Sequence, residues 1–219
     1  MRLVLISDTH GRHRELQLPE GDVLIHAGDF SSAGSWDELL EFSDWFQAQP
    51  HRHKILIAGN HDLLFEDFPE DARALFKGWA HYLQDSALTL EGLKIHGSPW
   101  TPRFFDYAFM LPRGRALAER WAKIPADTQL LITHGPAQGL GDRTFTGENA
   151  GCEALAEQLP RLPDLQLHVF GHIHEGYGYY PPSARRRYSS VNVSNCRWGD
   201  PGLNEPIWLD VEPRNCRQV

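Results

Sequence analysis

Near its start the chain carries a short aliphatic run that ends in polar residues: residues 2–10 read RLVLISDTH. The run Leu3–Ile6 is typical of a strand buried on both faces of a sheet, and Asp8 and His10 follow it directly. The same arrangement of apolar run and polar residues occurs four more times. The other runs are Val23–Ile25, Lys54–Ile57, Leu130–Ile132 and Leu167–Phe170.

Helices are predicted between these strands. Ser35 and Glu38 have the spacing of a capping box, which starts a helix that should end near Pro50. Two further helices are expected at Arg115–Lys123 and Glu153–Leu159. Strands that alternate with helices predict an α/β protein.

Other segments favour a second group of strands. Ala87–His96 alternates around a Glu-Gly pair and predicts a hairpin, and Tyr188–Val193 and Ile207–Val211 are rich in β-formers. The stretch Gly97–Gly114 is long for a loop, and long loops in compact domains are often functional. We therefore expect a mixed sheet or two sheets within one domain, residues 1–219.

Composition limits the classes of function. The 219 residues include 21 Lys and Arg against 29 Asp and Glu, for a net charge of −8, and 12 His. A negative balance argues against binding long nucleic acid, which selects a basic surface. The three cysteines, Cys152, Cys196 and Cys216, form no CxxC pair. No signal peptide or membrane-spanning run is seen, so a cytoplasmic protein without membrane contact is predicted.

Every one of the five apolar runs is followed by residues that can bind a metal. These residues are Asp8, His10, Asp29, Asn60, His61, His134, His172 and His174. Ligands bind at the carboxyl ends of strands in open α/β sheets, so these side chains should converge on one site. Carboxylate, amide and imidazole donors together suit Mn, Fe or Zn.

Without His61, seven ligands remain, which suits two ions that share a carboxylate. Two ions about 3.5–4 Å apart can clamp both the attacking and the leaving oxygens of a phosphoryl displacement, and a hydroxide between them would be the nucleophile.

Five motifs in order resemble the calcineurin-like metallophosphoesterase superfamily. They are Asp8-x-His10, Gly28-Asp29, Gly59-Asn60-His61-Asp62, Thr133-His134-Gly135 and Gly171-His172-x-His174. The resemblance implies a four-layer α/β/β/α sandwich of two mixed sheets flanked by helices. It also implies that Asp8, His10 and His174 hold one ion and that Asn60, His134 and His172 hold the other. Asp29 would bridge the ions and His61 would protonate the leaving oxygen, whereas Asp62, in the place of a frequent Glu, would not be a ligand.

A narrower resemblance rests on four more segments, HAGD at 26–29, GSPWTP at 97–102, LPRG at 111–114 and GLGD at 139–142. These are similar to the metallophosphoesterase-domain phosphodiesterases, relatives of the class III cyclic nucleotide phosphodiesterases. The resemblance implies two divalent ions, with Mn favoured and Fe, Zn, Co, Ni and Mg as alternatives. The implied substrates are small phosphodiesters, including cyclic nucleotides.

Two other functions stay open at this point. A phosphomonoesterase would use the same ligands, and a non-catalytic scaffold would keep the fold, although scaffolds of this kind usually lose ligands. The choice between monomer and homodimer, the natural substrate and the metal loaded in the cell also stay open.

Some further side chains are candidates for substrate contact. His13, His96 and Arg143 lie near the motifs in sequence, although a packed or surface position is the favoured interpretation of each. The long loop carries aromatic residues that could stack on a nucleobase, but a small core under the loop is the favoured interpretation. These aromatic residues are Trp100, Phe104, Phe105, Tyr107 and Phe109.

Overall fold

Five strands form the first sheet of the computed structural model, which describes residues 1–213. Their spatial order is β15-β1-β2-β3-β4, in which β1 to β4 run parallel and β15 is antiparallel. The strands are β1 (Arg2–Ile6), β2 (Val23–His26), β3 (His53–Leu56), β4 (His81–Tyr82) and β15 (Ile207–Asp210).

Six strands form the second sheet, in the order β11-β12-β10-β9-β6-β5. The four inner strands are parallel, and the two edge strands β5 and β11 are antiparallel to their neighbours. The strands are β5 (Ser86–Leu90), β6 (Leu93–Ser98), β9 (Leu130–Thr133), β10 (Leu167–Phe170), β11 (Gly178–Tyr180) and β12 (Ser189–Asn192). Two short ladders stand apart from the sheets. They pair β7 (Thr101–Pro102) with β8 (Met110–Leu111), and β13 (Cys196–Arg197) with β14 (Asp200–Leu203).

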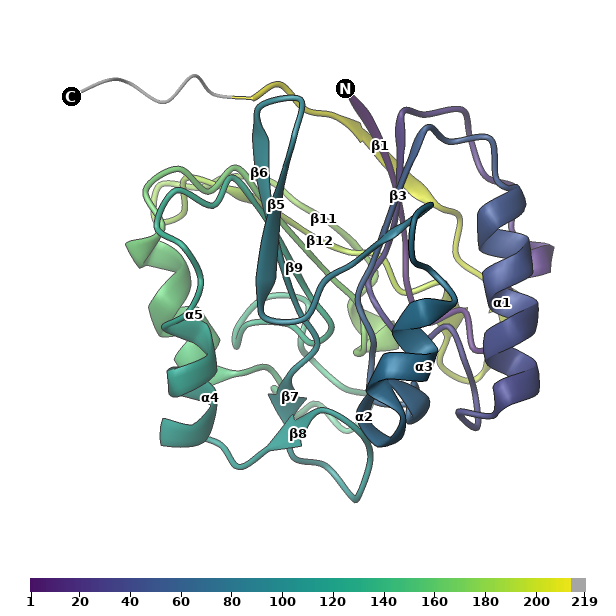
Figure 1. The fold of residues 1–219 in the computed structure, drawn as a ribbon. Helices are drawn as coiled ribbons and strands as arrows, with labels where there is room; N and C mark the ends of the chain where they lie inside the picture. Colours follow the sequence, from purple (N-terminus) through teal and green to yellow (C-terminus); the bar gives the residue numbers. More distant parts are fainter. Residues whose placement is uncertain (214–219) are drawn as a thin grey trace.

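Helices cover the outer face of each sheet. Figure 1 shows α1, α2 and α3 on the side of the first sheet and α4 and α5 on the opposite side of the molecule. The helices are α1 (Trp36–Ala48), α2 (Leu64–Asp67), α3 (Pro69–Ala74), α4 (Arg115–Trp121) and α5 (Glu153–Gln158), with 3-10 turns at His13–Glu15, Leu159–Arg161 and His174–Gly176. The predicted α/β/β/α arrangement of two mixed sheets flanked by helices is confirmed.

The first strand shows why its apolar run is continuous. Leu3 and Leu5 point into the core between the two sheets, whereas Val4 and Ile6 pack with the outer core under the helices. Successive side chains of a strand point to opposite faces, so a strand covered on both sides needs apolar residues at every position. The five runs predicted as strands are strands, and their bounds agree within one residue at each end.

The structure also contains the helix start and the hairpin that were predicted from local sequence patterns. The hydroxyl of Ser35 accepts a hydrogen bond from the Glu38 N–H at 3.3 Å, and the Glu38 carboxylate accepts one from the Ser35 N–H at 3.1 Å. This is the predicted capping box at the start of α1. The predicted hairpin is formed by β5 and β6, and Glu91 and Gly92 both have positive φ at its turn, as in a type I′ hairpin turn.

Two structural facts bear on the other sequence expectations. Among residues 1–213, every helix is too short or too polar to cross a bilayer. Cys152 and Cys196 are free thiols, and Cys216 lies outside the described residues.

Three histidines outside the predicted ligand set are buried in strands. Burial lowers the pKa of His26 and His168 to about 3 and that of His96 to about 4. An unfolded chain would hold these groups near their ordinary pKa of about 6.5. The unfolded state therefore binds more protons between these values, so the stability that the neutral histidines contribute is lost as pH falls below about 6.5.

We expect this effect in the pH dependence of unfolding. In His168→Gln, the side chain at 168 cannot take up a proton. The slope of unfolding free energy against pH, between about pH 5 and 6.5, should decrease by about 1 kcal/mol per pH unit relative to the parent. Urea titrations of both proteins in chelator measure the two slopes, with circular dichroism as the check that the variant folds. Equal slopes would contradict the assignment of His168 as a buried neutral group.

Candidate metal centre

The loops that follow five strands meet at one end of the two sheets. Asp8 follows β1, Asp29 follows β2, and both are fully or almost fully buried. From the second sheet, the His172 N–H donates to both carboxylate oxygens of Asp8 at 3.0 Å. His134 places its Nε2 3.3 Å from Oδ2 of Asp29. The residues predicted to converge, although as far apart in sequence as Asp8 and His174, therefore lie together.

Three groups of side chains have ligand atoms within 4.8 Å of one another. The groups are Asp8 with His10 and His174, His10 with Asp29 and His61, and Asp29 with His134 and His172. His10 and Asp29 each belong to two groups, so the three form one continuous row, which we call the ligand row. Asn60 joins its end, since its Oδ1 lies 2.9 Å from Nε2 of His134. Carboxylate, amide and imidazole donors in this arrangement fit two transition-metal ions.

Backbone carbonyls orient three of the imidazole rings. In each case Nδ1 faces a carbonyl oxygen, which can only accept, so Nδ1 carries the proton and Nε2 is left for a metal or a substrate. The pairs are His10 with Ser31 at 3.1 Å, His61 with Ser32 at 2.8 Å, and His134 with Ala27 at 2.9 Å.

The two buried carboxylates of the ligand row stay ionised, which favours the binding of cations. Burial would raise the pKa of Asp29, but the charge of His134 and its hydrogen bond hold that pKa well below the usual range. Burial also opposes ionisation of Asp8, but the hydrogen bond from His174 and the charges of His134 and His174 together outweigh it, so the pKa of Asp8 is lowered too. Conversely, burial opposes protonation of His134, but Asp29 outweighs burial and raises the pKa of that imidazole to about 9. Two buried carboxylates that stay ionised need positive charge beside them, which divalent cations supply.

Glycines in the motifs allow the close approach of these residues. A side chain at Gly59 would collide with the carboxylate of Asp29, and one at Gly171 would collide with Asp8. At Gly28 an added Cβ would lie 2.6 Å from Nδ1 of His134, and its φ of +98° is also unfavourable for other residues. The glycine that precedes a ligand in three motifs therefore has a steric cause.

Backbone strain is concentrated in the row. Asp8, His10, Asp29 and His172 have φ of 51°, 44°, 57° and 68°, and they are four of the eight non-glycine residues with positive φ among residues 1–213. Such conformations cost about 1–3 kcal/mol each and persist where surrounding contacts enforce them, often at functional sites. This strain has no signal in the sequence, because Asp and His occur commonly in ordinary turns.

Asp62 ties two of the loops together. Its carboxylate is buried and accepts from the N–H groups of Asp29 at 2.8 Å and Gly59 at 2.7 Å, and from the N–H and hydroxyl of Ser31 at 3.0 and 2.7 Å. Burial and the nearby charge of Asp29 raise the pKa of Asp62 to about 7. Asp62 is in none of the three groups of ligand atoms.

His61 occupies a distinct place in the row. It shares a group with His10 and Asp29, so a ligand role is sterically open to it as well. Its N–H donates to Oδ1 of Asp29 at 2.8 Å, and its ring lies 4.8 Å from the ring of His10 and 4.8 Å from that of Tyr107. Its ring therefore lies between His10 of the ligand row and the loop that carries Tyr107.

The structure places the three candidates for substrate contact elsewhere. His13 is fully buried against Phe42 and Trp45, with Nε2 2.6 Å from a Glu41 oxygen, and His96 is buried in β6. These two are core residues, which corrects the expectation that they face a substrate. Arg143 is exposed, and its guanidinium lies beside Gly147 in its own loop, so its role stays a prediction.

The aromatic residues of the long loop divide into two sets. Trp100 and Phe109 are buried and pack against each other at 5.5 Å, and they belong to the large outer core rather than to the separate small core that was expected under the loop. Phe104, Phe105 and Tyr107 are exposed.

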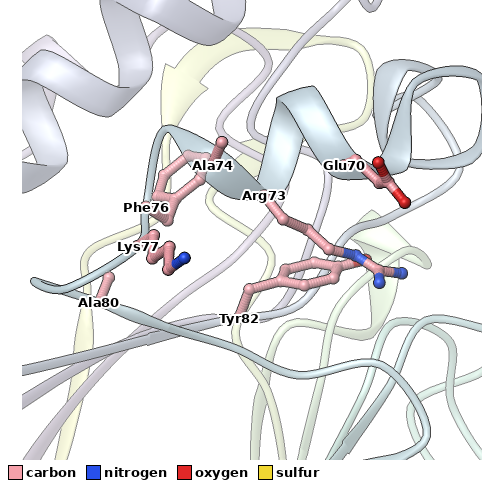
Figure 2. Close-up of a pocket in the computed structure, with 7 residues that line it drawn as sticks. All are labelled: Glu70, Arg73, Ala74, Phe76, Lys77, Ala80 and Tyr82. Atoms are coloured by element: carbon pink, nitrogen blue, oxygen red, sulfur yellow. The ribbon is translucent and has the colours of Figure 1, made fainter.

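A hollow of about 400 Å³ lies away from the ligand row, beside α3 (Figure 2). The guanidinium of Arg73 lies over the ring of Tyr82 at 5.3 Å, and Phe76 and Lys77 also line it. Its lining includes no residue of the ligand row, and it holds a single carboxylate, that of Glu70, and no histidine. We therefore do not assign the hollow as the metal centre.

Comparison with known proteins agrees with this geometry. The chain is 40% identical over 238 residues to the human metallophosphoesterase domain-containing protein 1, an alignment that covers 98% of this chain and 72% of the relative. A UPF0046 protein of Caenorhabditis elegans is 34% identical over 231 residues, which cover 96% of this chain and 81% of that protein. The family model described as calcineurin-like phosphoesterase matches residues 1–176, a span that contains the whole ligand row. The chain belongs to the calcineurin-like phosphoesterase family.

Proposed function

We propose that the protein is a two-metal-dependent phosphodiesterase that hydrolyses small phosphodiesters such as cyclic nucleotides. The observation that carries this proposal is the sharing of Asp29 between two adjacent groups of ligand atoms. A carboxylate in that position can bridge two ions. Two ions side by side suit the in-line displacement of an ester oxygen from phosphorus.

Each member of the row has a proposed part. Asp8, His10 and His174 would hold one ion, Asn60, His134 and His172 the other, and Asp29 would contact both. When bound, the ions would polarise the phosphoryl group and make water a nucleophile at neutral pH. The mixed oxygen and nitrogen donors favour Mn in this proposal, with Fe, Zn, Co, Ni and Mg as the alternatives to test.

His61 would act on the leaving group. Its Nδ1–H donates to the Ser32 carbonyl at 2.8 Å, so Nε2 is the nitrogen that can carry a proton to the departing oxygen. The hydrogen bond fixes the ring, and its contact with His10 places it beside the ligand row. A small substrate is proposed because the net charge of −8 disfavours a long polyanion. A cytoplasmic location, and action as a monomer or homodimer, complete the proposal.

The proposal is tested with bis-p-nitrophenyl phosphate, p-nitrophenyl phosphate and a panel of cyclic nucleotides. Protein stripped with chelator should be inactive, and Mn should restore diester hydrolysis at a rate well above monoester hydrolysis. A higher monoester rate would favour a phosphomonoesterase instead. No hydrolysis of any ester with any of the six metals, together with no retained metal, would favour a scaffold.

The role of His61 has its own test. His61→Ala should slow a diester with an alkoxide leaving group by about 10²–10⁴-fold, and one with p-nitrophenolate much less, because only the poorer leaving group needs a proton. Steady-state kinetics on both substrates give the ratio, and elemental analysis should show unchanged metal content. His81→Ala, which alters an exposed histidine, is the matched control. Equal slowing of both substrates with loss of metal would make His61 a ligand.

A further inference from the structure

Three aromatic side chains project into solvent from one short segment of the long loop. The exposed fractions are 63% for Phe104, 72% for Phe105 and 40% for Tyr107. The first two rings contact each other edge to face at 4.3 Å. Exposed apolar groups that gather in this way commonly mark a binding surface. We call these three residues the aromatic rim.

The segment that carries the aromatic rim is fixed to the metal centre. The Ala108 N–H donates to the carbonyl of Asn60 at 3.1 Å, and the Phe109 N–H donates to the Glu66 carboxylate at 3.1 Å. The β7–β8 ladder closes the base of the loop. Phe105 is held at a φ of 60°, a strained conformation for this residue type. The loop therefore holds its aromatic rings at a set position relative to Asn60 and His61.

The contact between Tyr107 and His61 gives the aromatic rim its place in the reaction. The two rings lie 4.8 Å apart at an angle of 33°. In the proposed mechanism His61 faces the oxygen that leaves, so the group attached to that oxygen lies on the His61 side of the phosphorus. The exposed part of Tyr107 would lie beside that group, and Phe104 and Phe105 are exposed on the same loop segment.

We propose that the aromatic rim is a subsite for the leaving arm of the substrate and that it selects a planar aromatic group, such as a nucleobase or an aryl ester. This inference rests on the proposed phosphodiesterase function. A planar group can stack on Tyr107, and stacking tolerates many ring types because each has a π-face. In a linear diester the retained arm would make no contact with the rim, so the rim would not select it; in a cyclic nucleotide both ester oxygens belong to the nucleoside that carries the base.

Two substrates with the same retained group and different leaving groups test whether Tyr107 binds the leaving arm. One is methyl phenyl phosphate, and the other is the methyl diester of a fluorinated alkyl alcohol of similar acidity. Tyr107→Ala should lower kcat/KM for the phenyl ester by about tenfold, mainly through KM, the order expected for one lost stacking contact. For the fluoroalkyl ester, kcat/KM of Tyr107→Ala should change by less than about threefold. Tyr107→Phe keeps the ring and should restore the phenyl preference.

The matched control is Trp208→Ala. Trp208 lies on the edge strand β15, is 49% exposed and packs against the guanidinium of Arg2. Its loss should therefore leave kcat/KM unchanged for both substrates. An equal loss on both esters in Tyr107→Ala would mean that Tyr107 only holds His61, and no loss on either would mean that it has no role. Either result overturns the subsite.

Two further outcomes are distinguishable from these. If the parent enzyme with Mn hydrolyses neither ester and no cyclic nucleotide, the proposed function itself fails and the subsite falls with it. If sedimentation shows a dimer that Phe105→Ala dissociates, while the ratio of phenyl to fluoroalkyl turnover stays unchanged in Tyr107→Ala, the rim is an interface between copies and the subsite is overturned.

Discussion

Replacing Asp29 with alanine is expected to reduce the rate of diester hydrolysis by at least about 10³-fold. Removing a single hydrogen-bond donor from an active site typically lowers kcat by about 10²–10³-fold, so the expected loss is at or above that range. Asp29 is the carboxylate common to two groups of ligand atoms, and its Oδ2 lies 3.3 Å from His134 Nε2 and 3.8 Å from His10 Nε2. Its loss removes negative charge between two sets of imidazoles. Neither ion would then be held at its proper place. Kinetics with saturating Mn and elemental analysis of the same samples measure both consequences.

The fold should survive this change, because Asp29 acts inside the row rather than in the apolar core. Circular dichroism of the parent and Asp29→Ala should agree. Asp71→Ala removes an exposed carboxylate from α3 and serves as the matched control, with unchanged rate and metal content. Parental turnover in Asp29→Ala would exclude the proposed site, and two retained ions per chain would exclude the bridging role.

The convergence of these ligands could be predicted from sequence because it depends on strand ends. Once Leu3–Ile6 and the other buried runs are recognised, parallel pairing brings their carboxyl ends to one edge. The polar residues that follow the runs of one sheet must then meet. Asp8 and His172 follow strands of different sheets, so their contact over 164 positions also depends on the packing of the two sheets against each other.

Other features depended on contacts that the sequence does not display. The helices α2 and α3 have four and six residues, too few for a helical period to be detected. The β7–β8 ladder has two residues on each strand and lies inside a stretch that reads as loop. His13, close to His10 in sequence, turns into the core because Phe42 and Trp45 of α1 cover it. In each case tertiary packing outweighs the local signal.

Within the site, the role of Asp62 likewise depends on contacts that the sequence does not display. The family resemblance implies only that Asp62 is not a ligand. The structure shows that it joins the loop after β2 to the loop after β3 through partners about 30 residues away, Asp29 and Ser31. A residue with no direct part in metal binding can therefore determine where the ligands lie.

Replacing Asp62 with alanine is accordingly expected to destabilise the protein more than the loss of Asp29 or His168. It leaves two buried N–H groups of Asp29 and Gly59, and the N–H and hydroxyl of Ser31, without their acceptor. Each unsatisfied group costs about 1–3 kcal/mol, so the free energy of unfolding should fall by more than about 3 kcal/mol. Chemical denaturation in chelator measures this loss without a contribution from bound metal.

Metal affinity provides an independent measure, because the loop positions matter even in molecules that stay folded. Asp62→Asn keeps one acceptor oxygen but turns an amide donor towards other N–H groups, so its stability should lie between the parent and Asp62→Ala. Metal affinity should follow the same order, decreasing by about 10–100-fold as expected for a residue that orients ligands. Asp67→Ala, an exposed acid in α2, is the matched control. If Asp62→Ala were as stable as that control and bound metal equally well, the two loops would have to be held together by other contacts, and the carboxylate could not be what fixes Asp29 beside Asn60.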